Sequence, residues 1–518
     1  MKQDSTLEQT TPLTTNKLLL PLAQVKLVDQ GTHFLKIKVV FFGQEQQHWM
    51  PLSLLDNPWK FSAYLADKVG YREQDTDSLK KQWQDSLSDL PYILGTSRLG
   101  WTADGKAFVY NGRVYPLDAK ETLQYEFVAP EGTIIKQASQ AFTPKGDKGE
   151  QFQTFRTLWK DSWEFRLVLS LATVSPLLEP LNVPPLLFHL AGLSGWGKTT
   201  LLRLALSGFA DPDSPLVKID ASKDTQNYAD AQLGILRNFP ILLDETTLGE
   251  PGSMEKVMYN LAMGRTKGRL GGSETLYLPT EPMQYNLVVF LSGEASLRNH
   301  LQHSGAAARL MEIMLEKEIF SKGDLPQWWD FAQTHYGWYG HTIIQDVIHQ
   351  YFCDGQNGTQ LKALYGECRE GISRWCQNHS RSLDFLAALQ LGHYLSANVL
   401  FHGCENSSPH AQCLEEAEEF VGTITEKLHT RTMLDQVVEC IQDIQGINSW
   451  VERGFIPTSN LEPVAQGCDW SHSQLGKFLI NHGMVSKIQP RKVEGGTSQR
   501  CYILTPSGKE KLCSNTTP

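Results

Sequence analysis

The sequence predicts an α/β fold that is built around a parallel sheet and divided into several domains. Residues 152 to about 320 alternate helical segments with short apolar runs, a pattern typical of parallel strands joined by helices. The stretch LLFHLAGLSGWGKTTLLRLAL, Leu186 to Leu206, passes from an apolar run through a glycine-rich turn into a helical pattern. A chain of 518 residues is also too long for a single hydrophobic core.

The composition is that of a globular protein, with 41% hydrophobic and 20% charged residues and a net charge of -10. This acidic balance argues against a general coating of nucleic acid but permits a local basic groove. The chain has no run of about 18 uninterrupted apolar residues, and its polar N-terminus lacks the apolar centre of a signal peptide, so we expect no membrane partner. All nine cysteines lie from Cys353 onward without a CxxC pair, which indicates reduced thiols and a cytoplasmic location.

The N-terminal third divides into a tail and a mixed domain. Residues 1–16 are rich in Thr and Gln and predict a disordered tail. Residues 17–150 predict a mixed α+β domain, in which HFLKIKVVFFG alternates as a strand does and Asn111-Gly112 marks a turn between two strands. The segment 143–151, TPKGDKGEQ, is rich in turn residues and predicts the linker to the next domain.

The glycine-rich turn lies in residues 151–325, the predicted α/β core, and matches the pattern G-x-x-x-x-G-K-[ST]. Glycines let successive N–H groups point at phosphates, and the start of the following helix adds partial positive charge. We expect Lys198 to reach the β- and γ-phosphates and Thr199 to bind Mg²⁺, so that ATP and Mg²⁺ are the cofactors. The residues expected around the nucleotide are Gly192, Leu193, Ser194, Gly195, Trp196, Gly197, Lys198, Thr199 and Thr200.

A second stretch, NFPILLDETT, predicts the acidic half of a hydrolytic site. Phe239 to Leu243 form a strand-like apolar run that ends in Asp244 and Glu245. Asp244 is expected to hold Mg²⁺ through water, and Glu245 to polarise the attacking water. Together with the glycine-rich turn, this pair predicts ATP hydrolysis.

The stretch YNLVVFLSGEASL predicts a third strand that ends in Ser292. Ser292 is expected to contact the γ-phosphate or to orient the water, with Glu294 as a rival for that role. The following stretch SGAAARLMEIML carries Arg309, which we expect to reach the nucleotide of a neighbouring subunit and stabilise transition-state charge. Arg298 is its nearest competitor, and a surface ion pair is the alternative role for Arg309.

The stretch LAMGRTKGRLGGSETLYLP lies between the acid pair and the third strand. Its Arg265, Lys267 and Arg269 alternate with small residues. Spaced cations on a flexible loop suit contact with a nucleic-acid backbone. The alternative is a solvated hairpin tip.

Residues 326–430 predict a helical lid, and residues 431–518 predict a winged helix, in which helices precede a strand, a Gly-Gly turn and a second strand. From Asp469 onward there are seven basic against three acidic residues, a local excess of four positive charges. Such modules also dock proteins, so DNA binding is one of two alternatives. The expected DNA contacts are Ser473, Gln474, Lys477, Arg491, Lys492 and Arg500.

Seven stretches, TSRLGW, GLSGWGKTT, ILLDE, YNLAMGRTKGR, VVFLSGE, GAAARLMEI and HYGWYGH, occur in this order between about residues 17 and 405. Together they resemble the domain-of-unknown-function family 927, found in helicase-like proteins of mobile elements and phages. The resemblance implies an ATPase core of the AAA+ type in a hexameric ring around DNA. It also implies that Arg265 to Arg269 form a pore hairpin and that Arg309 acts in trans.

The function expected from these features is that of an ATP-dependent DNA helicase or translocase in the replication of a mobile element or phage. Its partners would be single-stranded or forked DNA, further copies of the chain and a replication or initiator protein. One alternative is an ATP-driven switch that binds DNA without unwinding it, such as an initiator, a loader or a phage-defence NTPase. A third possibility is a platform whose winged helix binds protein.

Overall fold

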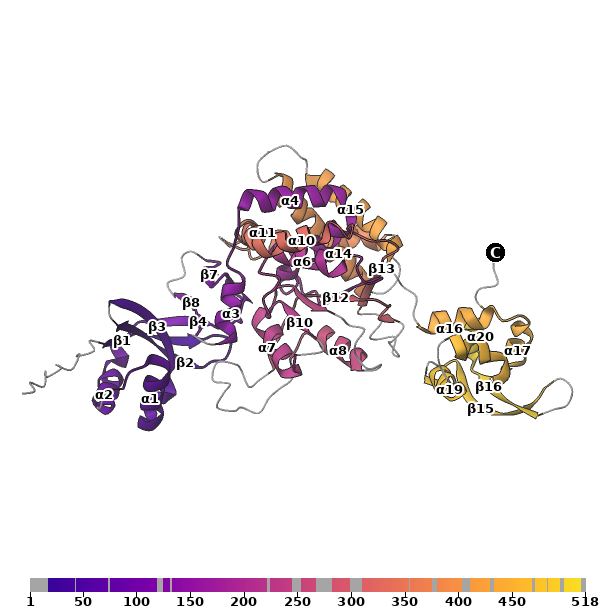
Figure 1. Ribbon diagram of the computed structural model, residues 1–518, viewed down its shortest axis with the longest axis horizontal. Coiled ribbons are helices and arrows are strands. Elements are labelled where there is room, and N and C mark those ends of the chain that lie inside the picture. The colour runs from indigo at the N-terminus through magenta and orange to yellow at the C-terminus, as the bar shows by residue number, and fades with distance from the viewer. Residues whose placement is uncertain are drawn as a thin grey trace, which may run out of the picture.

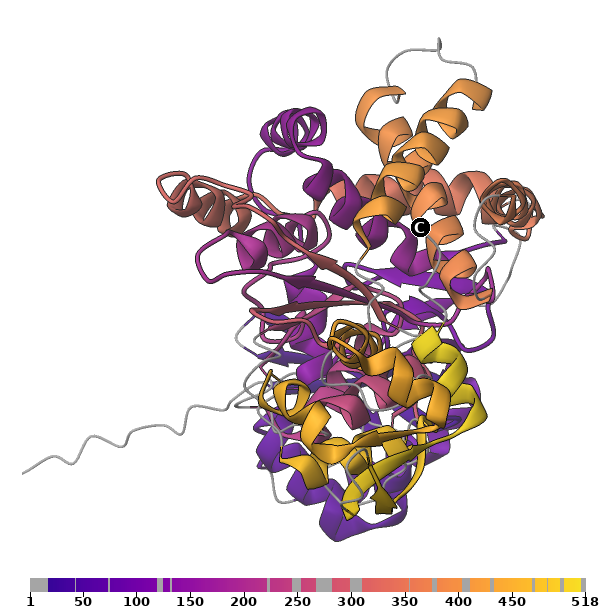
Figure 2. The ribbon, with the colours of Figure 1, turned by 90° about the vertical axis from the view of Figure 1, so that its right-hand side faces the viewer.

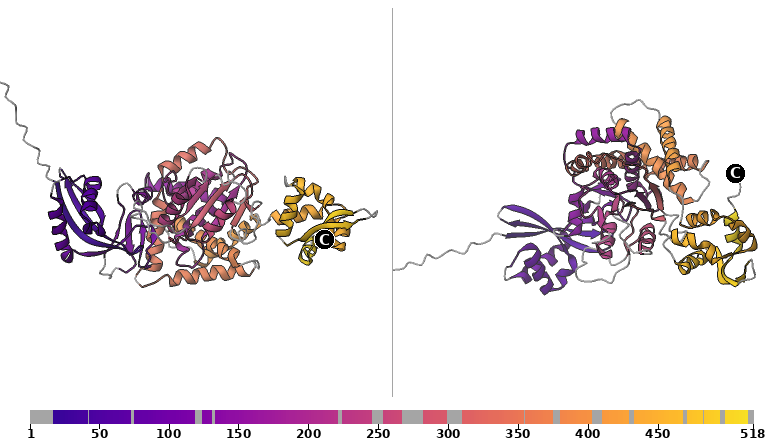
Figure 3. Two further views of the ribbon diagram at one scale, coloured as in Figure 1. Left: turned by 90° about the horizontal axis from the view of Figure 1, so that it is seen from below. Right: turned by 45° about the vertical axis from the view of Figure 1, so that its right-hand side comes forward.

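The computed structural model shows three bodies in a row, an N-terminal sheet, a large central part and a C-terminal unit (Figures 1 and 3). The predicted tail, residues 1–16, lies outside the described residues. These are 17–41, 43–72, 75–118, 124–130, 133–220, 224–244, 253–266, 282–298, 310–353, 355–374, 380–402, 410–428, 433–467, 471–481, 483–493 and 498–513.

The N-terminal sheet has the strand order β3-β2-β1-β4-β8. The expected strand within HFLKIKVVFFG is confirmed as β2. Its alternate residues Leu35, Ile37 and Val39 are buried and pack with Phe61 and Trp83 from two helices. The elements are β1 (Lys17–Leu27), β2 (His33–Phe41), β3 (Gln44–Pro51), α1 (Pro58–Tyr64), α2 (Thr76–Ser86), β4 (Tyr92–Thr96) and β8 (Tyr125–Phe127).

A small antiparallel sheet follows, with β5 (Gly100–Trp101), β6 (Ala107–Tyr110) and β7 (Arg113–Pro116). Its turn is the expected one, because Asn111 and Gly112 both have positive φ, 51° and 65°, as a two-residue hairpin turn requires. The side chains of β6 enter the core of the central part, where the rings of Phe108 and Phe239 lie 5.8 Å apart.

The expected domain boundary at residue 150 therefore does not coincide with a boundary in the packing. Residues from Leu99 onward share the core of the central part. The turn-rich stretch also ends earlier than expected, because the side chain of Asp147 accepts a hydrogen bond from the Glu150 N–H and caps a helix. The helices concerned are α3 (Ile134–Ala141) and α4 (Lys148–Asp161).

The central sheet is parallel, with the order β10-β11-β12-β9-β13. Every residue of β9 and β12 is buried, as expected for strands covered on both faces. The strands are β9 (Leu186–Ala191), β10 (Lys218–Asp220), β11 (Ile241–Asp244), β12 (Val288–Gly293) and β13 (Leu310–Met314). The helices of this part are α5 (Trp163–Val174), α6 (Lys198–Ser207), α7 (Gln226–Leu236) and α8 (Ser253–Ala262).

Most of the helices that follow β13 lie above the central sheet in Figure 1, and Figure 2 shows them spread across its width. They share its core, since a Cβ at Gly392 would lie 2.1 Å from the Ser170 carbonyl oxygen. Among the described residues, no helix is long and apolar enough to span a bilayer. The helices are α10 (Leu325–Thr334), α11 (Trp338–Ile343), α12 (His349–Phe352), α13 (Thr359–Ser373), α14 (Ser380–Ala397) and α15 (His410–Lys427).

The C-terminal unit has its own core, which includes Leu475, Leu479 and Tyr502. Its antiparallel sheet has the order β14-β16-β15, so the two expected strands are present as β15 and β16. The elements are α16 (Met433–Gln442), α17 (Ile447–Arg453), β14 (Phe455–Pro457), α18 (Glu462–Gly467), α19 (His472–Asn481), β15 (Val485–Lys492), β16 (Ser498–Leu504) and α20 (Pro506–Cys513).

Candidate phosphate-binding site

The loop between β9 and α6 needs glycine at defined points. Gly195 and Gly197 have φ of 80° and 85°, the left-handed region that other residues avoid. A Cβ at Gly197 would lie 3.0 Å from Cδ2 of Phe320. The backbone of the loop therefore curls closely against the segment that follows β13.

Lys198 is the first residue of α6, and its ammonium group lies beneath the loop. Its Nζ donates hydrogen bonds to the carbonyl oxygens of Gly192 (2.6 Å) and Leu193 (2.9 Å). Burial lowers the pKa of Lys198, and the nearby carboxylates of Glu294 and Asp244 oppose that shift. This cation adds to the partial positive charge at the start of α6, so the loop attracts an anion.

Asp244, the last residue of β11, is the centre of a polar cluster beside the loop. Its Oδ1 accepts hydrogen bonds from Thr199 Oγ1, at 3.2 Å, and from Ser292 Oγ. Its Oδ2 lies 2.9 Å from Lys218 Nζ. Burial raises the pKa of Asp244, but the hydrogen bonds from Ser292, Lys218 and Thr199 outweigh burial, so the pKa lies below its usual value. The structure thus brings together three residues that the sequence predicts at the site, Thr199, Asp244 and Ser292.

Lys218 is the member of this cluster that sequence reasoning missed. It begins β10, which pairs in parallel with β11 so that Lys218 lies opposite Leu242. Lys218 is the first residue of a strand of only three residues. Nothing in so short a sequence pattern indicates that a carboxylate will lie beside it. Because Lys218 binds Oδ2, it fixes the orientation of the Asp244 carboxylate and leaves Oδ1 facing Thr199.

Replacing this lysine by methionine, Lys218→Met, is expected to move the acid limb of the pH–activity profile to higher pH. Lys218 helps to lower the pKa of Asp244, so without it the carboxylate becomes protonated at a higher pH. ATP turnover measured between about pH 4.5 and 8 reads the shift. The control is Lys322→Met, since Lys322 is exposed and is not among the residues that line the cavity. An unmoved acid limb would contradict the assigned role.

The other sequence-predicted polar residues fall into two groups. Glu294 lines the cavity described below, whereas Arg298 is buried and donates to the carbonyl oxygen of Leu310. Arg298 is therefore part of the connection between β12 and β13 and does not face outward. Glu245 and Arg309 lie outside the described residues.

A buried pair, His189 and Glu312, lies directly behind the loop. His189 Nδ1 is 2.6 Å from Glu312 Oε2, and both side chains have no exposed surface. Glu312 also accepts hydrogen bonds from Ser296 Oγ and from the Leu297 N–H. It therefore ties β9 and β13 to the segment that follows Ser292. The sequence contains no signal for this cluster, because the partners come from three separate segments.

A cavity of ≈ 370 Å³ adjoins the loop, within the range of pockets that hold small ligands. Its Thr199, Asp244 and Ser292 oxygens are the ligand type that Mg²⁺ prefers, so both expected cofactors fit. Trp196 is half-buried against the central core and, like Gly192 and Leu193, is not among the residues that line the cavity. The lining residues are Ser194, Gly195, Gly197, Lys198, Thr199, Thr200, Asp244, Ser292, Gly293, Glu294 and Leu325.

The basic stretch that we expect at DNA is described only at its base. Arg265 pairs with Gln284 in an antiparallel bridge. The Thr266 N–H donates to the Met283 carbonyl oxygen at 2.9 Å, which closes the base of this connection between α8 and β12. Lys267 and Arg269 lie outside the described residues.

The expected DNA contacts of the C-terminal unit do not share one face. Lys492 and Arg500 lie on the face of the β15–β16 hairpin that carries Tyr502, whose hydroxyl donates to the His472 carbonyl oxygen of α19. Arg491 pairs with Gln499 and lies on the opposite face, because side chains alternate along a strand.

Within α19, Lys477 and Ser473 are exposed. Gln474 is also exposed, but its side-chain oxygen accepts hydrogen bonds from the Ser471 N–H and hydroxyl. The Ser471 hydroxyl in turn accepts from the Gln474 N–H. This reciprocal pair is a capping box. The side chain of Gln474 therefore caps the N-terminus of α19 in this structure.

The parallel sheet, the glycine loop before α6 and the acid at the end of β11 define the class of P-loop nucleotide-binding folds. Within that class, the chain belongs to the family of the domain of unknown function DUF927, whose model matches residues 9–275. This confirms the resemblance seen in the sequence.

The solved structure of "SCCmec type IV Cch - active helicase" is similar over 95% of this chain and 94% of its own, with a TM-score of 0.62 and 15% identity. At this identity the likeness shows a shared fold. The NrS-1 C-terminal region matches over 94% of this chain and 96% of its own at 11% identity, with a TM-score of 0.31. No curated protein sequence matches the chain.

Proposed function

We propose that this chain is an AAA+ ATPase that moves along DNA and unwinds it. The observation that carries the proposal is the contact of Asp244 with both Thr199 and Ser292 beside the phosphate loop. The sheet order supports the AAA+ class, because β12 lies between β9 and β11 and brings Ser292 between the loop and the acid. The similar fold named as an active helicase supports unwinding as the work that hydrolysis would drive.

Each residue of the cluster has a distinct role in this proposal. Lys198 would neutralise the β- and γ-phosphates, Thr199 would bind Mg²⁺, and Asp244 would hold the metal through water. Mg²⁺, when bound, neutralises the charge that develops on the phosphate oxygens. Ser292 holds Asp244 in place and faces the γ-phosphate, and Glu245 orients the attacking water.

The proposed assembly is a hexameric ring in which Arg309 of one copy completes the site of the next. Residues 326–430 then act as a helical lid and residues 431–518 as a winged helix. The arrangement of α18, α19 and the β15–β16 hairpin supports the latter. Its cellular setting would be the replication of a mobile element or phage, with a replication or initiator protein as partner.

A forked DNA duplex with one labelled strand tests the proposal. The full chain with ATP and Mg²⁺ is expected to displace the labelled strand, and the Lys198→Ala variant to leave it in place. Hydrolysis without displacement would instead indicate an ATP-driven switch that binds DNA without unwinding it. Absence of DNA binding, or binding that does not depend on salt, would favour a protein-docking platform.

Arg500→Ala and Lys492→Ala are each expected to weaken DNA binding and to reduce its salt dependence by about one released ion. The reason is that both cations lie on the face of the hairpin that contacts α19 through Tyr502. Fluorescence anisotropy at several salt concentrations measures the slope. Arg491→Ala is the matched control, since its side chain lies on the other face. Equal losses in all three variants would contradict this surface.

A further inference from the structure

The motif TSRLGW, Thr96 to Trp101, joins the N-terminal sheet to the end of α7. The last carbonyl groups of a helix have no partner within it. In α7, two of these carbonyl oxygens accept hydrogen bonds from the TSRLGW motif. Arg98 Nε donates to the Gly234 carbonyl oxygen at 2.5 Å, and the Leu99 N–H donates to that of Ile235 at 2.8 Å.

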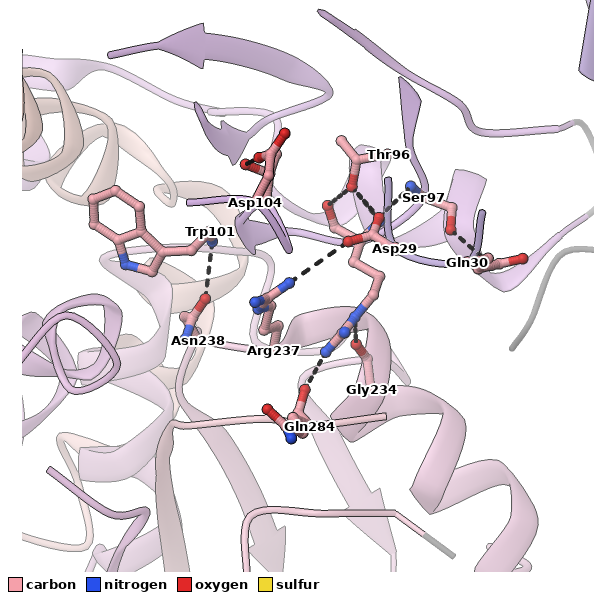
Figure 4. Close-up of polar contacts among 12 residues, drawn as sticks. Asp29, Gln30, Thr96, Ser97, Trp101, Asp104, Gly234, Arg237, Asn238 and Gln284 are labelled. Carbon is pink, nitrogen blue, oxygen red and sulfur yellow. Dashed lines mark hydrogen bonds and ion pairs between the residues drawn. The ribbon is translucent and has the colours of Figure 1, made fainter. Parts of the chain in front are cut away.

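Arg98 makes a second contact, to a different element. Its Nη2 donates to the carbonyl oxygen of Gln284, which lies in the base of the connection between α8 and β12. Figure 4 shows Gly234 and Gln284 on either side of one guanidinium group. A single buried side chain thus holds the end of α7 and the base of that connection together.

The charges around this contact are balanced. Arg237 forms an ion pair with Glu179 at 2.8 Å and lies 3.6 Å from Asp29. Asp29 in turn accepts hydrogen bonds from the Thr96 hydroxyl and from the Ser97 N–H (Figure 4). Burial, together with the nearby Arg237, lowers the pKa of Arg98 to about 10, so the guanidinium is still a cation at neutral pH.

The backbone between α7 and β11 is strained at this junction. Arg237 has a φ of 52°, a conformation that costs about 1–3 kcal/mol in a residue other than glycine unless its surroundings impose it. Here the Asn286 N–H donates to the Arg237 carbonyl oxygen at 2.7 Å. Since β11 follows directly and ends in Asp244, these contacts connect Gln284 and Asn286 to the strand that carries the acid.

We propose that Arg98 is a positioning residue that couples the base of the α8–β12 connection, at Met283 to Asn286, to the strand that carries Asp244. A buried cation that only filled space would be replaced at little cost by an apolar side chain. Arg98 instead bonds carbonyl groups of two elements, the end of α7, which leads into β11, and the base of the α8–β12 connection. The inference rests on the proposed function in one respect, namely that the phosphate loop binds nucleotide.

Hydrogen–deuterium exchange of the full chain, with and without a non-hydrolysable ATP analogue and Mg²⁺, tests the coupling. In the natural chain the analogue is expected to change exchange both in the loop, residues 192–200, and at residues 282–286. In Arg98→Met the change in the loop is expected to persist and the change at residues 282–286 to be lost. Arg98→Lys, which keeps the charge but not the planar fork of donors, is expected to retain part of the response.

The control is Lys36→Met, which removes an ion pair of 2.8 Å with Glu126 inside the N-terminal sheet and is expected to leave both responses intact. A full response at residues 282–286 in Arg98→Met would overturn the coupling. So would a natural chain that responds in the loop alone. No response in the loop of the natural chain would count against the proposed nucleotide function instead. Should Arg98→Met not fold, as judged by circular dichroism, an undiminished response in Arg98→Lys would overturn the proposal and a reduced one would support it.

Discussion

Lys198→Ala is expected to lower ATP turnover by about 10²-fold or more, the size of effect seen when one charge-stabilising group is removed from a preorganised site. The ammonium group is held beneath the loop by two carbonyl oxygens, at the place where the phosphates would bind. Removing it takes away a positive charge that acts on the transferred phosphate. The fold should persist, because Lys198 lines a cavity that water can enter and does not belong to the apolar core. Steady-state phosphate release and circular dichroism measure the two effects.

The matched control for this variant is Lys322→Ala. Lys322 is exposed, and its Cε lies 3.8 Å from where a Cβ on Gly195 would stand. It therefore removes a cation from the neighbourhood of the loop without touching the groups beneath it. If both variants turned over ATP at the natural rate, the assignment of the phosphate site would be wrong.

Glu312→Gln is expected to give the largest loss of stability, about 3 kcal/mol, because it removes a fully buried carboxylate that His189, Ser296 and Leu297 all contact. Glu312 accepts hydrogen bonds from three partners, and neither it nor His189 has exposed surface. The amide of Gln cannot accept all three at once, so at least one buried donor is left without a partner. Urea unfolding of the natural chain and the variant measures the difference.

The same pair predicts how this difference depends on pH. Burial raises the pKa of Glu312, but the hydrogen bonds from His189, Ser296 and Leu297 outweigh it, so the folded pKa lies below the usual value. Its contribution is then fully present above the unfolded pKa of about 4.3 and is lost as the pH falls through the folded value. The two proteins should therefore converge in stability in acid. A gap that stayed constant down to about pH 3 would contradict this account.

The sequence was sufficient for the parts of the site that obey local rules. The phosphate loop follows from its glycines and its lysine, and Asp244 follows from an apolar run that ends in an acid. Ser292 was expected for the same reason, and the structure places it against Asp244. In each case one short segment determines both the backbone and the side chain, so no distant partner has to be known.

Lys218 and the Glu312 cluster could not be found in this way. Lys218 meets Asp244 only because β10 pairs with β11, and Glu312 meets His189 only because β13 pairs with β9. Strand order within a sheet is set by packing of the whole core, which no short window of sequence contains. The packing of β6 in the central core could not be predicted for the same reason, since the residues that its side chains contact lie far along the chain.

The rings of Trp101 and Phe352 lie 4.6 Å apart, and this contact bears on how the protein is made. Strand β5 leaves the ribosome long before α12 has been synthesised, so the growing chain carries exposed aromatic surface for much of translation. Pairings between such distant residues form slowly, and exposed apolar surface favours aggregation while they are missing. Cells that produce this protein are therefore expected to need chaperones until the helices after β13 have emerged.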